Sequence, residues 1–414
     1  MKNCVDSRIP REVGAGALPD HPAIKTPWEK LISFYDAYHY ATRHNAAVAA
    51  CFMEVMRIII PDYATRCKRL CEATGRAMKG AFSTAFGKMH KENNGIHPFM
   101  QGGYFTALYG DSGDERIGLC GRVNDFGTYR AEKELDVCDW DILGSEVCRI
   151  STYGGLTSIS QAYGGIPMEY HMPEAKGCGD LHCRVVAENR DKYPMPEHEC
   201  WENFGPIATA DQIKFTPEEK MFKECQQFRE ECGYKYRNGL DQEYTAAELY
   251  TSGGATNITG TDYCGLLLKE MVGANEIGME ELSNIITCVF EAAGKTMFAE
   301  FFAVKGLRDW LGVPADVKDG RVLGGYIEVI LQTILANYTI VEFNKEEVVY
   351  DIPVSGIERR IALRPMLTTA YLAMWYGMSK TLVGSQWSLW RETEGVPEDI
   401  IRLKIAKKID KFCR

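Results

Sequence analysis

The sequence lacks histidine after residue 198, although the first 198 residues hold all eight histidines. Cysteine is uneven in the same direction, with ten of the 15 residues before residue 201. A positive charge excess is also missing, because the formal net charge is −10. Affinity for phosphate backbones depends on clustered Lys and Arg, so the charge argues against nucleic-acid binding. We therefore expect the titratable and sulfur chemistry in the N-terminal half.

Long uncharged apolar runs are absent as well. The two longest apolar stretches, 46–60 and 322–341, contain Glu54 and Glu328 respectively, whereas a membrane helix needs about 20 nearly uncharged residues. Residues 1–8 have no apolar core of the kind that a secretory signal requires. We expect a cytoplasmic protein without membrane contact, in which the cysteines stay reduced as thiols.

Helical and strand patterns follow one another along the chain and predict an α+β fold in two domains. Residues 1–25, punctuated by Pro and Gly, are expected to form an N-terminal arm. Residues 26–190 are expected to form helices and then an antiparallel sheet. Proline and charge concentrate in 191–235, which is the predicted linker. Residues 236–414 are expected to form a mostly helical α+β domain.

Several local elements can be predicted more closely. Thr, Pro and Glu in segment 26–29 are typical of a helix start, and 63–89 has helical spacing. In the second half we expect a hairpin over 340–352, a helix over 366–382 and an amphipathic helix over 397–409. The order of helix, hairpin and helix there loosely repeats that of the first half.

The most informative pattern joins Cys148 to a later pair, Cys178 and Cys183. The four residues inside this pair include Gly-Asp, which predicts a tight turn that brings both sulfurs near one ion. Thiolate with imidazole or carboxylate in tetrahedral geometry favours zinc. The alternative is buried structural thiols without a metal, which is also the expectation for Cys120 and Cys138.

At these residues the sequence resembles the 4-vinyl-reductase-type domain, a small-molecule-binding domain that also forms the aromatic-sensing part of bacterial phenol-responsive activators. It is similar as well to the L-2-amino-thiazoline-4-carboxylate hydrolase family, whose members carry a comparable Gly-Asp-x-x-Cys ending. The resemblance covers about residues 100–190 and rests on Cys148, the following Tyr153-Gly154, and the stretch from Gly179 to Val185. In the sensor proteins three cysteines and one glutamate hold a structural zinc beside a buried pocket for an aromatic ligand.

The resemblance implies a zinc site with four ligands: Cys148, Glu174, Cys178 and Cys183. Cys148 matches the first cysteine of the pattern and Cys183 the last. The second cysteine is displaced, because Ala175 stands where the family has it. Glu169 and His171 remain open as alternatives to Glu174.

Aromatic residues of the same region are expected to line a small-molecule pocket with a few hydroxyl groups: Tyr104, Trp140, Tyr153 and Tyr163. The histidines of this region are the candidates for general acid–base chemistry: His97, His171 and His182. The competing interpretation is that these residues are ordinary core aromatics and structural histidines.

The pattern favours a zinc-associated enzyme that acts on a small cyclic or aromatic molecule, with ring-opening hydrolysis as the expected reaction. The alternative is a non-catalytic binding or sensor protein with a structural zinc. Four protein ligands would make the ion structural, whereas an open position would let it activate water. A third hypothesis is an interaction protein whose helical second half forms a dimer. In that third case the pocket would be vestigial. Our main expectation is a homodimer that binds a small hydrophobic or cyclic molecule.

Overall fold

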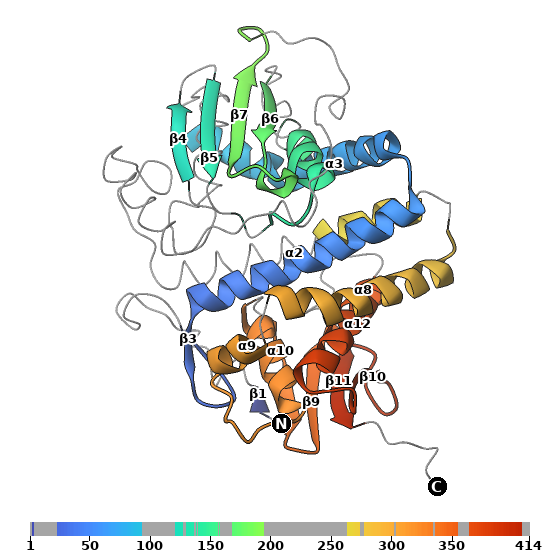
Figure 1. Ribbon diagram of the computed structural model, residues 1–414. Helices are drawn as coiled ribbons and strands as arrows, with labels where there is room; N and C mark the ends of the chain where they lie inside the picture. Colours follow the sequence, from blue (N-terminus) through green and yellow to red (C-terminus); the bar gives the residue numbers. More distant parts are fainter. Residues whose placement is uncertain are drawn as a thin grey trace. The chain divides into compact units, whose positions relative to one another are not determined.

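The computed structural model of the chain describes residues 2–3, 23–92, 121–126, 130–135, 138, 140–155, 157, 168–193, 263–273, 277–301, 304–333, 336–354 and 364–407 (Figure 1). Helices and small antiparallel sheets make up this part of the chain, so the α+β class is confirmed. No helix in the described ranges is both long and apolar enough to cross a bilayer.

Two compact units divide the chain: unit 1 contains residues 1–55 and 245–414, and unit 2 contains residues 56–244. Unit 1 thus joins the start of the chain to its second half. The predicted linker, 191–235, lies almost entirely outside the described residues. The predicted domain boundaries therefore stay a prediction.

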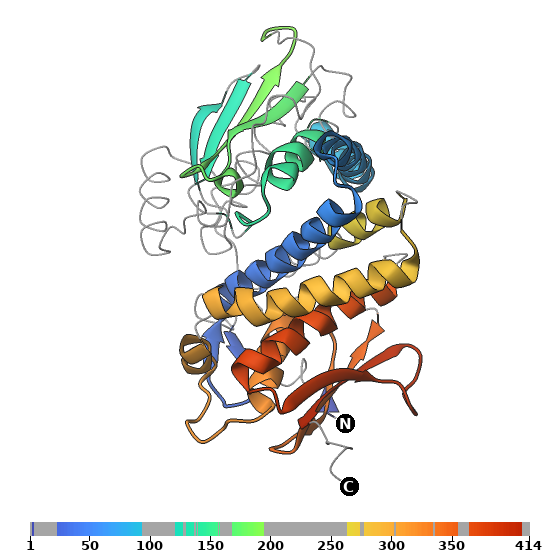
Figure 2. The same ribbon diagram turned by 45° about the vertical axis from the view of Figure 1, so that its right-hand side comes forward.

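Unit 1 is built on a five-stranded antiparallel sheet in the order β1-β8-β9-β11-β10 (Figures 1 and 2). Its strands are β1 (Lys2–Asn3), β8 (Thr339–Phe343), β9 (Glu347–Pro353), β10 (Trp387–Glu392) and β11 (Ile400–Lys407). Its helices are α2 (Phe34–Ile59), whose last turn enters unit 2, α8 (Met279–Phe301), α9 (Val304–Leu311), α10 (Arg321–Thr333) and α12 (Arg364–Leu382), with a further helical stretch over 263–273.

Strand β11 shows that one predicted element of unit 1 is wrong, whereas two other predicted elements are confirmed. Residues 400–407 form a strand, so the amphipathic helix expected over 397–409 is wrong. Ile401, Leu403 and Ile405 are buried while the residues between them are more exposed, which is the period of two that a half-buried strand requires. The hairpin over 340–352 and the helix over 366–382 are confirmed.

A short hairpin replaces the helix predicted to begin at Thr26. Strands β2 (Ala23–Lys25) and β3 (Leu31–Ser33) pair across this segment, and α2 begins only at Phe34. The hydroxyl oxygen of Thr26 accepts the N–H of Trp28 at 3.3 Å, so the expected capping residue closes a turn instead. Trp28 packs on α10, since a Cβ at Gly325 would lie 2.6 Å from its ring.

Inside unit 1, helices α2 and α12 are joined by buried polar contacts. Trp375 Nε1 donates to His44 Nε2 at 2.9 Å, and the Tyr371 hydroxyl donates to Asn45 Oδ1 at 2.8 Å. Burial lowers the pKa of His44 to about 3. His44 is therefore a neutral imidazole with its proton on Nδ1, and it acts as an acceptor within the core.

Unit 2 combines helix α3 (Tyr63–Glu92) with a four-stranded antiparallel sheet in the order β4-β5-β7-β6. The strands are β4 (Gly121–Phe126), β5 (Arg130–Leu135), β6 (Met168–Glu174) and β7 (Cys183–Asn189). Two short helical segments complete it: the π-helix η2 (Glu146–Ser151) and the 3-10 turn η3 (Lys176–Cys178).

The two units share one topology. In each, a hairpin, a helical segment and a second hairpin follow one another, and the second strand pairs with the fourth at the centre of the sheet. Leu135 is opposite Cys183 in unit 2, and Tyr350 is opposite Leu403 in unit 1. The loose repeat in the sequence is thus a common strand order, β4-β5-β7-β6 and β8-β9-β11-β10.

Candidate functional site

The π-helix η2 carries three of the polar side chains from which the site is built. Glu146, Cys148 and Arg149 all lie on this six-residue segment, between the two hairpins of unit 2. A π-helical turn has poorer hydrogen-bond geometry than an α-helix and is frequent at functional sites. The π-helix is therefore one reason to consider this segment as part of a functional site.

The β6–β7 connection brings the other two predicted cysteines to Cys148. Cys178 ends η3, Gly179 turns the chain with a φ of 93°, and Cys183 begins β7. Cys148 and Cys178 pack against the same apolar cluster to which Cys183 belongs. The three cysteines are therefore brought together as the sequence predicted.

Close backbone approach holds this arrangement. A Cβ at Gly177 would lie 2.4 Å from Cys148 Sγ, so no larger residue fits between η3 and η2 without displacing the sulfur. The N–H of Lys176 donates to Cys183 Sγ at 3.3 Å. A backbone donor directed at a sulfur stabilises thiolate character, as in many cysteine metal sites.

Asp180 fastens the connection to the π-helix. Its Oδ2 accepts the N–H of Ala175 at 2.7 Å and Arg149 Nη2 at 3.1 Å. Arg149 Nη2 also donates to the Pro173 carbonyl at 3.3 Å. One carboxylate thus closes its own turn and ties that turn to the helix that carries Cys148.

Burial is the main influence on the thiols. It raises the pKa of Cys178 to about 11 and that of Cys183 to about 12, and it raises the pKa of Cys148 well above its ordinary value. All three are protonated thiols at neutral pH when no cation is bound. A cation would have to displace these protons, because only the thiolate is a strong metal ligand.

A fourth thiol that the sequence did not single out lies in the same neighbourhood. The pKa of Cys148 is raised first by burial and then by Cys178, Cys183, Cys138 and Asp141. The Cys148 thiol also lies 3.9 Å from the carbonyl oxygen of Trp140, so the 138–141 turn reaches the cluster. Cys138 was expected to be a core thiol without a metal, and that expectation stays untested. We call Cys138, Cys148, Cys178 and Cys183 the thiol cluster.

The thiol cluster suits zinc in chemistry but is not in ligating geometry. Its members are free thiols. Among the residues that the structure describes, no three His, Cys, Asp or Glu side chains stand in positions to hold one ion. Sulfur donors, one of which accepts a backbone N–H, are of the chemical type that zinc prefers.

The two carboxylates considered as the fourth ligand have partners of their own. Glu174 Oε2 lies 2.6 Å from His182 Nε2, and its other oxygen lies 3.5 Å from Arg184. Glu169 pairs with Arg190. His171 lies in β6 beside a β-bulge, and only its backbone is described.

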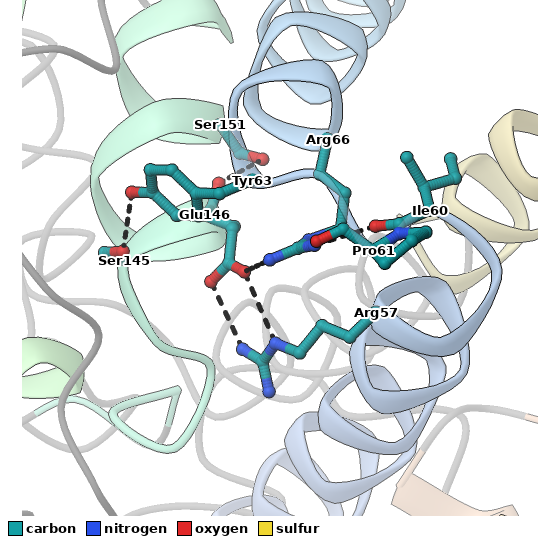
Figure 3. Close-up of polar contacts among 8 residues, drawn as sticks. All are labelled: Arg57, Ile60, Pro61, Tyr63, Arg66, Ser145, Glu146 and Ser151. Atoms are coloured by element: carbon teal, nitrogen blue, oxygen red, sulfur yellow. Dashed lines mark hydrogen bonds and ion pairs between the residues drawn. The ribbon is translucent and has the colours of Figure 1, made fainter.

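A buried ion-pair network anchors the π-helix from its other side (Figure 3). Glu146 is fully buried and accepts Arg57 through Nε at 3.3 Å and Nη2 at 3.2 Å, while Arg66 Nη2 donates to it at 3.3 Å. Arg66 Nη1 also donates to the carbonyls of Ile60 and Pro61. The network joins the end of α2, the start of α3 and η2, and it therefore positions Cys148 two residues along.

The remaining predicted residues are only partly covered. Tyr153 packs against the small cluster of Cys67 and Ile150, and Trp140 contributes its carbonyl to Cys148. His97, Tyr104 and Tyr163 lie outside the described residues. The pocket itself stays a prediction.

A scan against protein-family models, a search of curated proteins and a search of solved structures each gave no match to this chain. The resemblance to the 4-vinyl-reductase-type domain therefore stays an expectation from the sequence.

Proposed function

We propose that the chain is a zinc-binding protein in which the thiol cluster holds one structural ion, in a unit that takes up a small cyclic or aromatic molecule. The zinc proposal is supported by the packing of Cys148 and Cys178 against the cluster that contains Cys183, and by the electrostatic influence of Cys138 on Cys148. The class of small molecule rests on the resemblance of residues 100–190.

Cys138 is the fourth ligand in this proposal, in place of Glu174. The contacts of Glu174 with His182 and Arg184 support this choice, because each of its two oxygens already faces a partner and would have to turn from it to reach the ion. Four thiolates leave no open position on a tetrahedral ion. Zinc bound in this way would hold the 138–141 turn, η2 and the β6–β7 connection together.

Zinc content of the full-length protein, purified without chelators, tests the proposal. We expect about one zinc per chain in the wild type and a large loss in Cys148→Ser, Cys178→Ser and Cys183→Ser. Cys138→Ser and Glu174→Gln distinguish the fourth ligand, since only the former is expected to lose zinc.

Cys288→Ser is the matched control, because Cys288 is an exposed thiol in unit 1. Its zinc content is expected to equal that of the wild type. Absence of zinc from the wild type would refute the central proposal. Loss of zinc from Glu174→Gln with retention in Cys138→Ser would restore the ligand set that the family resemblance implies.

Ring-opening hydrolysis is the second candidate function, and the pair of His182 and Glu174 favours it. At 2.6 Å the carboxylate can orient the imidazole, and the His182 side chain is 30% exposed and so can meet a substrate. A histidine fixed by a carboxylate is a common general base. In this version the ion stays structural and His182 takes the proton from the attacking water.

Turnover of L-2-amino-thiazoline-4-carboxylate by wild type, His182→Asn and Arg184→Gln tests this candidate. We expect His182→Asn to lose activity by about 100-fold or more, and Arg184→Gln to lose much less. Equal activities of wild type and His182→Asn, or no turnover by the wild type, would exclude this reaction and leave the binding function.

Homodimer formation and cytoplasmic location accompany the proposal as predictions from the sequence. Light scattering coupled to size exclusion measures the first directly, with a mass near twice 46.6 kDa expected.

A further inference from the structure

The buried helix α10 presents one polar face to the sheet of unit 1. Gly324, Glu328 and Gln332 follow one another at intervals of four residues and so share a face. A Cβ at Gly324 would lie 2.8 Å from Val348 and 3.3 Å from the Tyr350 hydroxyl. This face therefore looks toward β9, and all residues from Val322 to Thr333 are buried.

Two other polar side chains of this helix, Glu328 and Thr333, have hydrogen bonds that suit the interior. Glu328 is fully buried and accepts the hydroxyls of Tyr338 and Tyr350, each at 3.0 Å. Thr333 donates to the Ile330 carbonyl at 2.7 Å.

Gln332 differs from them. It is fully buried, and within the described part of the chain neither its amide nitrogen nor its amide oxygen has a hydrogen-bond partner. Burial without a partner is strongly unfavourable for both groups, and such cases in native proteins call for a ligand, a bound water or a strained functional site. Leu or Met would fill the same place without this penalty.

We propose that Gln332, with Glu328 one turn before it, forms the recognition edge of a second ligand site, in unit 1, for a small uncharged molecule with an amide, lactam or urea group. Such a group offers a carbonyl to the Gln332 N–H and an N–H to its oxygen or to the Glu328 carboxylate. An anion would be repelled by Glu328 if that group is ionised, and an apolar ligand would leave the amide unpaired. The site is independent of the thiol cluster and of the function proposed for unit 2.

Thermal unfolding of the full-length protein with 2-pyrrolidinone or isobutyramide tests the site. The readout is tryptophan fluorescence, because Trp375 and Trp387 are fully buried in unit 1. We expect these amides to raise the melting temperature of the wild type by several degrees at saturation. Cyclopentanone and isobutyrate, which lack the N–H, are expected to have no such effect.

Gln332→Met is the decisive variant. Without probe it is expected to melt about 2–6 °C above the wild type, since the unpaired amide is gone, and it is expected not to respond to the amides. The exposed Gln386 supplies the control, because Gln386→Met is expected to keep the wild-type response. Equal shifts in wild type and Gln332→Met would overturn the proposal, as would the lack of any shift in the wild type.

A crystal of the wild type soaked in 2-pyrrolidinone gives an answer that does not depend on the variant folding. Density for the lactam within hydrogen-bond distance of the Gln332 amide supports the proposal. A buried water there, with no lactam, assigns Gln332 a structural role and refutes it.

Discussion

Unit 1 and unit 2 each contain a hairpin–helix–hairpin module, formed by β8 to β11 and by β4 to β7. The two modules have the same strand order, but different contacts stabilise them. In unit 1 the intervening helix is α12, of 19 residues, and the central strand β9 is buried over five consecutive residues, Val348 to Ile352. In unit 2 the same place is taken by a helical stretch described over 145–155, in which the π-helix η2 is held by ion pairs and flanked by thiols. The connection between β10 and β11, residues 393–399, contains no cysteine.

This difference shows that one topology can be stabilised in two ways. In unit 1 a long helix packs on the sheet and buries apolar surface, and buried hydrogen bonds from Trp375 and Tyr371 join it to α2. In unit 2 the fully buried Glu146 pairs with Arg57 and Arg66 and fixes the π-helix, and the proposed zinc would add a second such constraint. Cys51 and Cys264 of unit 1 fit this picture, because they are fully buried and burial raises their thiol pKa values, as for inert core cysteines.

Removal of the metal is expected to give the largest difference in stability between the two modules. If zinc is bound, a chelator should increase amide hydrogen exchange in β7 by more than about 100-fold, since structural zinc contributes several kcal/mol to small folds. Exchange in β11 should stay unchanged. Equal changes in both strands would mean that the modules do not differ in metal dependence.

Glu146→Met is expected to have the next largest effect. It leaves the guanidinium groups of Arg57 and Arg66 without their carboxylate, which costs about 3–5 kcal/mol for a buried pair. Asp351→Asn in unit 1 is the matched comparison, because the pair of Asp351 and Arg402 is partly exposed and its loss should cost about 1 kcal/mol. Urea unfolding followed by exchange in β7 and β11 measures both.

Replacing one glycine by alanine in the second hairpin of each module tests how closely the two connections are packed. Gly177→Ala should destabilise unit 2 by about 1–3 kcal/mol, because the new methyl would meet Cys148 Sγ at 2.4 Å. Gly395→Ala, in the β10–β11 connection, meets no atom within 4 Å and costs only the strain of its φ of +67°, about 1 kcal/mol. If Gly395→Ala proved the more harmful, close packing at the thiol cluster would not be the cause.

Acid should act on unit 1 through His44. Its pKa is lowered from 6.5 to about 3 by burial, so below pH 6.5 the unfolded chain binds a proton that the folded chain refuses. The free energy of unfolding should therefore fall by about 1.4 kcal/mol per pH unit from this residue as the pH drops toward 3. His44→Phe should remove that part of the pH dependence, measured by tryptophan fluorescence. An unchanged slope would mean that His44 is not the group responsible.

Local patterns predicted the elements better than the contacts between them. Apolar spacing predicted helices over 63–89 and 366–382, which match α3 and α12 within a few residues. Ile401 and Ile405 satisfy helical as well as strand spacing, and only pairing with β9 and β10 decided for the strand. A Thr at position 26 can cap a helix or close a turn, and the pairing of β2 with β3 decided that it closes a turn.

For the site, the sequence by itself determined the supply of thiols and the turn between Cys178 and Cys183, because turn chemistry is local. It did not indicate Cys138 or Glu146, since a cysteine ten residues from Cys148 and a single glutamate carry no spacing signal. Tertiary structure brought Cys138 to the cluster and buried Glu146 between two arginines. Burial and charge pairing are long-range properties, and they exist only once the chain has folded.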